Sequence, residues 1–250
     1  MSPPSLNRLK LRYRAWRYRL KLDREEVRWL RRALRPGDTA IDIGAHKGAY
    51  TFWMRRAVGR GGRVFAFEPQ PQLAGYLVRT VSDFGWDNVT VENMCLSAAA
   101  GELVLNVPGG EASPGASLVP GKARPGDVQI PVQVETLDHY LKGRGAEHGV
   151  RFIKCDVEGH ELEVFQGARQ TLQDQAPVLL FECEARHNFE RPMSAVFSYL
   201  EGLGYRGYFF WRRRLLAVSG FTPEVHQILG ADDYANNFLF VPDGFDVPID

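Results

Sequence analysis

Two amphipathic stretches occupy the first 35 residues of the chain. From Leu6 to Leu20, apolar side chains recur at alternating spacings of three and four residues with Lys and Arg between them, which predicts a basic amphipathic helix. The apolar positions of this helix are Leu6, Leu9, Tyr13, Trp16 and Leu20. Asp23, with Glu26 three residues later, predicts the N-cap of a second helix, which runs to Leu34 and stops before Pro36-Gly37.

Beyond residue 38, short β-branched and apolar runs alternate with stretches that are compatible with helix. The expected strands are 39–43, 63–67, 89–93, 150–157 and 177–182, and the expected helices are 49–58, 70–84, 161–173 and 193–203. Repeated strand–helix steps predict a parallel sheet with right-handed crossovers and helices on both faces. The expected fold class is therefore α/β, with a doubly wound architecture.

Two segments depart from this rhythm. Residues 102–107 and 128–134 alternate in polarity around a segment rich in Gly, Pro and Ser at 108–126, which predicts an inserted β-hairpin with a long mobile loop. Loops of this length serve as lids over a site or as tethers, and both interpretations stay open. After residue 203, antiparallel strands are expected at 205–210, 215–218 and 238–241.

The formal net charge of +1 conceals a strong asymmetry along the chain. Residues 1–35 contain twelve Lys and Arg against three Asp and Glu, whereas the remainder contains nineteen against twenty-seven. We therefore divide the chain into a basic helical extension, residues 1–35, and a main domain, residues 36–250. A basic arm can pack on the acidic body of its own chain, lie on an anionic membrane surface or bind nucleic acid, the last being least favoured here.

Composition narrows the class of protein further. A hydrophobic content of 44% is enough for a core, no apolar run is long enough to cross a bilayer, and no signal-peptide pattern follows Met1. We expect a soluble, cytoplasmic protein, with a peripheral position on the inner membrane face as the alternative. Cys95, Cys155 and Cys183 form no Cys-x-x-Cys pair and lie in or beside apolar runs, which favours buried free thiols.

The first expected strand ends in the sequence DIGAHKGAYT, residues 42–51. Gly44 and Gly48 allow backbone N–H groups to come close to a ligand at the mouth of the following helix. A nicotinamide fingerprint requires a glycine where this chain has His46, and no P-loop sequence occurs. The remaining form, D-x-G-x-x-x-G, allows Asp42 to face the ammonium group of a zwitterionic ligand.

Charged side chains also end two other expected strands. Glu68 follows the strand at 63–67, where doubly wound folds hydrogen-bond a ribose diol. Asp156 lies near the end of the strand at 150–157, and the alternation of side chains along a strand puts Lys154 and Asp156 on one face of it. These side chains are therefore expected in the crevice at the carboxyl edge of the sheet, where such folds bind ligands.

Five sequence blocks stand out in order along the chain. They are DIGAHKGAYT (42–51), FEP (67–69), ETLDHY (135–140), FIKCDVEGHELEVFQGA (152–168) and NNFLFVP (236–242). Together they resemble the FkbM-type family of methyltransferases. The resemblance implies a Rossmann-like class I methyltransferase fold with a seven-stranded, mostly parallel sheet. It also implies S-adenosylmethionine as methyl donor and a hydroxyl acceptor on a sugar, glycan or secondary metabolite.

The same resemblance assigns a cofactor site. Its residues would be Asp42, Gly44, Ala45, His46, Gly48, Thr51, Glu68, Pro69, Cys95, Leu96, Ser97 and Asp156. The glycine loop would hold the amino-acid end of the cofactor, Glu68 its ribose, and residues 95–97 its adenine. His46 stands where the family often has Asn, and either side chain can donate a hydrogen bond.

Methyl transfer to a hydroxyl is an in-line displacement that also requires removal of the acceptor's proton. The catalytic candidates are Asp156, Lys154 and His160, with Asp156 ranked first as general base. An ordinary carboxylate is a weak base for this task, so its pKa must be raised by burial. A divalent cation is the alternative, because Asp156, Glu182 and Glu184 could bind Mg²⁺ through their oxygens.

Two other functions stay open at this point. An RNA or protein methyltransferase could be guided by the basic arm, although residues 156–159 are DVEG and not the [DN]-P-P-[YF] of many amino-methylating enzymes. A catalytically inactive module could keep the fold as an interaction platform. The complete set of Asp42, Glu68 and Asp156 favours an enzyme.

Overall fold

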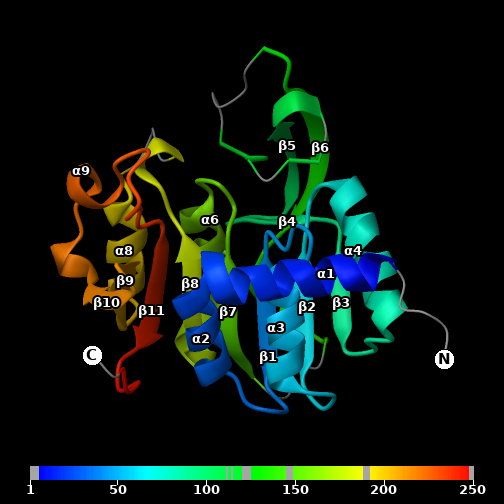
Figure 1. Cartoon of the computed structure of the whole chain (residues 1–250), viewed down its shortest axis with the longest axis horizontal. Coiled ribbons are helices and arrows are strands. Elements are labelled where there is room, and N and C mark those ends of the chain that lie inside the picture. Colours follow the sequence, from blue (N-terminus) through cyan, green and yellow to red (C-terminus); the bar gives the residue numbers. More distant parts are fainter. Residues whose placement is uncertain are drawn as a thin grey trace.

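The chain folds into an α/β structure built on one large mixed sheet (Figure 1). The computed structural model describes residues 6–110, 112–113, 115–119, 125–144, 149–187 and 192–247. The parallel strands are β1 (Thr39–Ile43), β2 (Arg63–Phe67), β3 (Val89–Glu92), β7 (Val150–Cys155) and β8 (Val178–Glu182). The strands that join them in antiparallel pairs are β9 (Tyr205–Trp211), β10 (Arg214–Ala217) and β11 (Asn237–Pro242).

The strand order β10-β9-β11-β8-β7-β1-β2-β3 confirms the predicted doubly wound architecture with an antiparallel C-terminal part. Within the described residues this sheet has eight strands and not the seven implied by the family resemblance. The eight strands correspond to the eight runs in the hydrophobic pattern. The edge strand β10 forms a hairpin with β9 across a turn at Arg212 and Arg213, both of which have positive φ.

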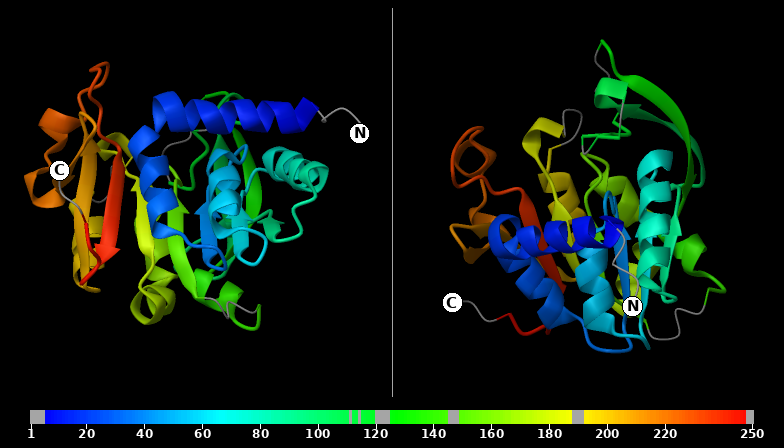
Figure 2. Two further views of the ribbon diagram at one scale, coloured as in Figure 1. Left: turned by 60° about the horizontal axis from the view of Figure 1, so that its bottom comes forward. Right: turned by 45° about the vertical axis from the view of Figure 1, so that its right-hand side comes forward.

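Helices cover both faces of this sheet (Figures 1 and 2). One face carries α1 (Leu6–Arg17), α2 (Arg24–Ala33), α3 (Ala49–Val58) and α4 (Pro71–Phe84). The other carries α5 (Leu137–Leu141), α6 (Glu161–Gln166), α7 (Arg169–Gln175) and α8 (Ser194–Glu201). A short helix, α9 (Pro223–His226), follows β10. Central strands are thus buried on both sides, which explains why β8 is a continuous apolar run up to its last residue.

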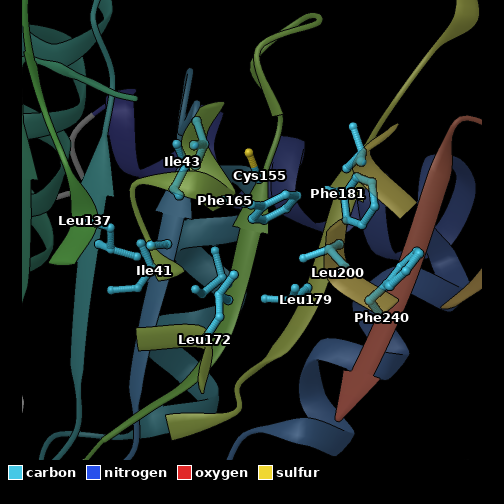
Figure 3. Packing of buried hydrophobic residues seen from close by; sticks show 14 of the residues in the cluster. Ile41, Ile43, Leu137, Cys155, Phe165, Leu172, Leu179, Phe181, Leu200 and Phe240 are labelled. Atoms are coloured by element: carbon cyan, nitrogen blue, oxygen red, sulfur yellow. The ribbon is translucent and has the colours of Figure 1, made fainter. Parts of the chain in front are cut away.

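Successive side chains of a strand enter different hydrophobic clusters. Ile41 and Ile43 of β1 lie in the cluster on the side of α5–α8, where Phe165 of α6 and Phe181 of β8 also pack (Figure 3). Ala40 lies in the opposite cluster, with α1–α4. The same alternation turns Asp42 toward α3. A carboxylate is thereby placed under the loop that joins β1 to α3.

A second, smaller sheet is inserted between β3 and β7. Strands β5 (Gly101–Val107) and β6 (Val128–Glu135) form the predicted antiparallel hairpin, and β4 (Cys95–Leu96) pairs with β6 in parallel. The hairpin rises beyond the carboxyl edge of the main sheet (Figure 1). Residues 111, 114 and 120–124 lie outside the described residues, and the mobility expected for 108–126 stays a prediction.

The helix expected at 161–173 is interrupted at Gly167, between α6 and α7. A Cβ atom on Gly167 would lie 1.9 Å from the carbonyl oxygen of Ser97, so only glycine allows this approach of two main chains. The Asp138 carboxylate accepts hydrogen bonds from the backbone N–H groups of Gln170 and Thr171, both at 2.8 Å, at the start of α7. The break therefore depends on contacts with distant parts of the chain.

The N-terminal extension packs on the domain through a face of α1 that its apolar spacing did not indicate. Leu11 and Ala15, one turn apart, are fully buried on the side of α3 and α4. The indole N–H of Trp53 in α3 donates to the carbonyl oxygen of Ala15 at 2.9 Å. The apolar positions singled out in the sequence face outward, with exposed fractions of 64% for Leu6, 49% for Leu9, 73% for Tyr13, 43% for Trp16 and 63% for Leu20.

A π-helical turn, Tyr18–Leu22, joins α1 to α2. Asp23 occupies the N-cap position of α2, but its side chain makes no capping hydrogen bond, contrary to the prediction. Its carboxylate accepts instead from the Tyr50 hydroxyl of α3, at 2.8 Å. Asp23 thus ties the extension to the domain, while the division of the chain at residue 35 stays a prediction. In the part of the chain that the structure describes, no helix has both the length and the apolar character needed to span a membrane.

Replacing Leu11 by Ala should lower the free energy of unfolding by about 2–4 kcal/mol, because a fully buried leucine loses its contacts and leaves a cavity. Leu9→Ala is the matched control on the outward side of α1 and should cost less than about 1 kcal/mol. Denaturant unfolding followed by circular dichroism measures both values. Equal losses in the two variants would contradict the packing of α1 on the domain.

Candidate active site

A cavity of about 370 Å³ lies at the carboxyl ends of β1, β2, β7 and β8. The chain runs from β1 outward to β2 and β3 and later resumes at β7 on the other side of β1, the type of position where doubly wound folds bind ligands. The predicted site residues that line this cavity are Asp42, Gly44, Ala45, His46, Glu68, Pro69, Cys95, Leu96, Lys154 and Asp156. The sheet therefore brings four separate sequence motifs together.

Four predicted site residues do not line the cavity. Thr51 lies in α3, hydrogen-bonded to a neighbouring carboxylate. Gly48 precedes α3 with a φ of +79°, and a Cβ there would lie 2.6 Å from a leucine side chain of α4. Ser97 and His160 contact each other, with Oγ and Nε2 2.9 Å apart. The geometry gives these residues supporting positions, and their direct roles in cofactor binding or catalysis stay predictions.

Gly44 determines the shape of the loop after β1. It has a φ of +75°, and a Cβ atom on it would lie 1.9 Å from the carbonyl oxygen of Asp156. Its N–H group and that of Ala45 donate to the carbonyl oxygen of Phe67, at 3.0 and 2.9 Å. These two N–H groups tie the loop to β2, whereas the sequence suggested that they serve a ligand. Glycine is required here because two main-chain segments touch.

Asp42 is a buried carboxylate beneath this loop, with 2% of its surface exposed. It accepts a hydrogen bond from the Thr51 hydroxyl. Burial raises the pKa of Asp42 to about 6, and both Thr51 and the Lys154 ammonium oppose the shift. A cationic ligand group beside this carboxylate would stabilise its ionised form, so the position suits the ammonium end of an amino acid.

Glu68 directly follows β2, as expected, and is 2% exposed. Its two carboxylate oxygens accept hydrogen bonds from the backbone N–H groups of His46 at 2.8 Å and Gln70 at 2.9 Å. Burial raises the pKa of Glu68 to about 7, and these two hydrogen bonds oppose the shift. Each carboxylate oxygen has further acceptor capacity, so Glu68 can also accept from a diol in the cavity.

His46 carries a buried polar atom that no group in the described part of the chain satisfies. Its Nε2 is buried without a hydrogen-bond partner, although the residue lines the cavity. Such atoms are uncommon in folded proteins because an unpaired buried polar group is costly. Burial lowers the pKa of His46 to about 4, and the nearby charges of Lys47 and Arg14 act in the same direction. The imidazole is therefore neutral at physiological pH.

The wall after β3 is apolar. Met94, Cys95 and Leu96 line the cavity in succession, which suits a flat, weakly polar group such as a nucleobase. Burial raises the pKa of the Cys95 thiol to about 12, so this side chain stays neutral. All three cysteines of the chain are free and buried, as predicted.

The opposite end of the cavity is charged. Lys154 is 2% exposed, and its Nζ lies 3.7 Å from Asp156 Oδ2 and 5.2 Å from the centre of the Tyr50 ring. Burial alone would lower the pKa of Lys154, but the carboxylates of Asp156, Glu182 and Asp23 raise it above its ordinary value. Lys154 therefore stays protonated at neutral pH. A protonated ammonium cannot accept a further proton, which argues against Lys154 as the general base.

Asp156 and Glu182 form the carboxyl pair of this end. The Asp156 side chain is 37% exposed and lines the cavity. Burial raises its pKa, the Lys154 ammonium opposes the shift, and Glu158 adds to it. The pKa of Glu182 is raised well above its ordinary value by burial and then by the charge of Asp156. Burial and this neighbouring charge therefore favour the protonated form of Glu182, and Asp156, which lines the cavity beside the Lys154 ammonium, is placed to accept a proton.

The three carboxylates considered for Mg²⁺, Asp156, Glu182 and Glu184, each have another partner. Asp156 lies beside the Lys154 ammonium. Glu184 is held by the Arg186 guanidinium and by the Tyr234 hydroxyl, the latter at 2.6 Å. Glu182 accepts a hydrogen bond from the side-chain amide of Asn236 at 2.7 Å. Among the residues that the structure describes, no group of three or more His, Cys, Asp or Glu side chains is arranged to hold a metal ion. This geometry does not support the alternative of a Mg²⁺ site at these carboxylates.

Part of the cavity wall consists of residues that the sequence analysis did not predict for the site. Arg14 and Tyr18 reach it from α1 and the π-helical turn, and Arg14 donates to the carbonyl oxygen of Lys47 at 3.0 Å. Gln70 holds the inserted loop through two hydrogen bonds with the backbone of Ser113, at 2.8 and 2.9 Å. Gln70 directly follows the FEP block, a signal that could have identified it. No pattern connects residues 14 and 18 to the glycine loop.

Residues 42–206, which are 165 of the 250 residues, match the model of the methyltransferase FkbM domain. The chain belongs to the FkbM methyltransferase family. The resemblance noted in the sequence is thereby confirmed, and the cavity carboxylates Asp42, Glu68 and Asp156 all lie within the matched FkbM domain. Arg14 and Tyr18 precede that domain. No curated protein matches the sequence significantly.

Solved structures share the FkbM fold at low sequence identity. An FkbM methyltransferase from Methylobacillus flagellatus has a TM-score of 0.51 and 17% identity, and the match covers 94% of this chain but 55% of that one. An rRNA methylase from Streptococcus thermophilus has a TM-score of 0.50 and 13% identity, with 88% and 95% covered. A Streptococcus mutans protein described as a methyltransferase, in complex with SAH, has a TM-score of 0.50 and 10% identity, and the match covers 87% of this chain and 96% of that one. These matches show the Rossmann-like methyltransferase fold alone.

If Glu68 holds a ribose diol, the affinity of this FkbM domain for S-adenosylhomocysteine should fall as the pH is lowered from about 8 to about 6. Hydroxyl groups donate to the ionised carboxylate, and with a pKa of about 7 each pH unit below that value reduces this form by up to about tenfold. Glu68→Gln should bind about 1.5–3 kcal/mol more weakly at pH 8 and lose most of this pH dependence. Isothermal titration calorimetry gives both values, and a constant wild-type affinity would contradict the assignment.

Proposed function

We propose that this protein is an S-adenosylmethionine-dependent O-methyltransferase that acts on a hydroxyl group of a sugar, glycan or secondary metabolite. One observation carries the proposal. Asp156, a carboxylate exposed to the cavity, shares that cavity with Asp42 and Glu68. The cavity would thereby hold the methyl donor next to a carboxylate that can take up a proton. When bound, the cofactor supplies a methyl group on a positively charged sulfur, and that sulfur keeps the electron pair of the broken bond.

The cavity residues suit successive parts of this cofactor. Asp42 suits the ammonium group, Glu68 the ribose diol and the apolar wall at residues 94–96 the adenine. His46 Nε2, buried without a partner, offers a further hydrogen bond. The fold neighbour from Streptococcus mutans, which is in complex with SAH, supports the same choice of ligand. These matches between residues and ligand groups are the basis for proposing this cofactor.

In the proposed reaction Asp156 takes the proton of the acceptor hydroxyl while the oxygen forms its bond to the methyl carbon. Lys154, protonated and 3.7 Å away, orients the carboxylate and offsets its charge. Glu182 lines the same end of the cavity, and its raised pKa favours the neutral form, which adds no second negative charge beside the acceptor. Leu105 and Leu118 of the inserted sheet and loop cover the cavity with apolar surface, which helps to keep water out.

The acceptor end suits a compound with several hydroxyl groups. Tyr18 and Tyr50 line it beside the carboxyl groups of Asp156, Glu158 and Glu182. Aromatic rings contact the C–H faces of a sugar and carboxylates accept from its hydroxyls, so this mixture supports a polyol more than a flat base. The rRNA methylase likeness, at 13% identity, concerns the fold and gives no support to an RNA acceptor.

S-Adenosylhomocysteine should bind the purified protein and raise its melting temperature. A ligand that binds only the folded state stabilises it by RT ln(1 + [L]/Kd), which is about 2.7 kcal/mol at a hundredfold excess over Kd. Differential scanning fluorimetry with adenosine as the control ligand measures the shift. A folded protein that shows neither a shift nor heat of binding would contradict the cofactor assignment and with it the proposed function.

Asp156→Asn should keep cofactor affinity and lose turnover by about 10²- to 10⁴-fold, because the amide cannot accept the proton. Glu182→Gln is the matched comparison. Because the raised pKa of Glu182 favours its protonated form, which the amide resembles, turnover should fall by less than about tenfold. Radiolabelled methyl transfer to a panel of sugars and glycosylated metabolites provides the assay. Similar losses in both variants would remove Asp156 as the specific base.

A further inference from the structure

The outward side of α1 presents apolar and basic side chains together. With 3.6 residues per turn, one stripe runs along the helix, and all of its members are exposed. The stripe consists of Leu6, Leu9, Tyr13 and Trp16. Exposed Lys10 and Arg17 border it on one side, and exposed Arg12 borders it on the other. We call these seven residues the outward face of α1.

The outward face of α1 belongs to a segment whose charged residues are all basic. Residues 1–22 contain seven Lys and Arg and no Asp or Glu. The π-helical turn continues the same character, because Leu20 and Leu22 are 63% and 48% exposed and Lys21 is exposed between them. The left view of Figure 2 shows α1 lying along the outside of the molecule. Positive charge and apolar surface therefore coincide at one accessible edge.

Attachment of α1 to the domain does not account for the outward face. The buried residues of α1 are Leu11 and Ala15, which lie on the opposite side of the helix and pack on the domain. Trp16 is the partial exception, since its ring meets Trp53 edge-on at 5.3 Å, with the Arg19 guanidinium 5.0 Å from its centre. That contact fixes the indole while 43% of the residue stays exposed. The other apolar members of the stripe are more exposed still.

Three kinds of partner could meet such a surface. A second copy of the chain would bring two clusters of like charge together, and a nucleic acid would use the basic residues without needing the apolar stripe. An anionic bilayer uses both features, since apolar side chains enter the acyl boundary while Lys and Arg meet the headgroups. We propose that the outward face of α1 binds the surface of an anionic membrane. Because binding to vesicles requires no methyl transfer, this inference is independent of the proposed function.

The position of α1 connects this surface to the cavity. Arg14 and Tyr18, from the same helix and the turn that follows it, line the cavity. A protein bound through the outward face of α1 would thus hold its cavity across one helix from the lipid surface. Basic residues near an anionic membrane each strengthen binding roughly fivefold, and the effect falls off within a Debye length.

The full chain should cosediment with vesicles of phosphatidylglycerol and phosphatidylcholine, and much less with vesicles of phosphatidylcholine alone. Ionic strength of about 1 M, where the Debye length is about 3 Å, should release most of the bound protein. Lys10→Gln/Arg17→Gln should lower the partition coefficient roughly 25-fold, from about fivefold for each charge removed.

Leu9→Ser/Tyr13→Ser tests the apolar stripe and should weaken partitioning by at least about tenfold. Both positions are exposed, so the melting temperature should stay close to that of the wild type. Val225→Ser/Leu229→Ser is the matched control, because these apolar residues are 55% and 70% exposed near Asp232 and Asp233. It should bind vesicles as the wild type does.

Folded wild-type protein that fails to cosediment with the phosphatidylglycerol vesicles would overturn the proposal. So would a Leu9→Ser/Tyr13→Ser variant that binds as tightly as the wild type, since charge alone would then explain binding, as it would for RNA. Self-association in sedimentation velocity that this variant abolishes, without vesicle binding, would assign the outward face of α1 to a second copy of the chain. Each of these results can be obtained whether or not the protein transfers methyl groups.

Discussion

The contact between the loop after β1 and the main chain after β7 is the constraint on which the rest of the site depends. Gly44 leaves room for the carbonyl oxygen of Asp156, and the Asp156 N–H donates to the carbonyl oxygen of Ile43 at 3.0 Å. The same loop is bound to β2 through Phe67. The end of β1 is therefore clamped from both sides, and Glu68 and Asp156 take fixed positions on either side of it. A side chain at position 44 would force these strands apart.

This clamp holds ionisable groups where water cannot stabilise their charge. With a pKa of about 6 for Asp42 and about 7 for Glu68, the ionised forms reduce the free energy of unfolding at neutral pH. Burial disfavours the charge of Lys154, and several carboxyl groups around it favour that charge. The structure is thus stabilised by the hydrophobic clusters on the two faces of the main sheet and carries a polar site at their edge. A ligand with a cation and hydroxyl donors would relieve part of this cost.

The hydrophobic pattern predicted what depends on local sequence. The bounds of β1 and β2 agree with it, because strands buried on both faces are continuous apolar runs. The motif carboxylates were found because they end such strands. Features that depend on contacts between residues far apart in the sequence could not be predicted from this local pattern. The break at Gly167 depends on Ser97, and the burial of Leu11 and Ala15 in α1 depends on the helices of the domain, from which Trp53 donates to the carbonyl oxygen of Ala15. The raised pKa of Glu182 arises from burial and from the charge of Asp156, which follows a neighbouring strand, and it has no local signal.

The β5–β6 hairpin forms one wall of the cavity without adding a strand to the main sheet. Its loop is attached to the domain through Gln70 and through the Ser117 hydroxyl, which donates to the carbonyl oxygen of Glu158 at 2.7 Å. The entropy of closing a loop grows slowly with its length, so this insertion can lengthen or change in sequence while the clamp at Gly44 is preserved. The wall of the cavity that this insertion forms can therefore change in shape and polarity without moving Glu68 or Asp156 on either side of β1.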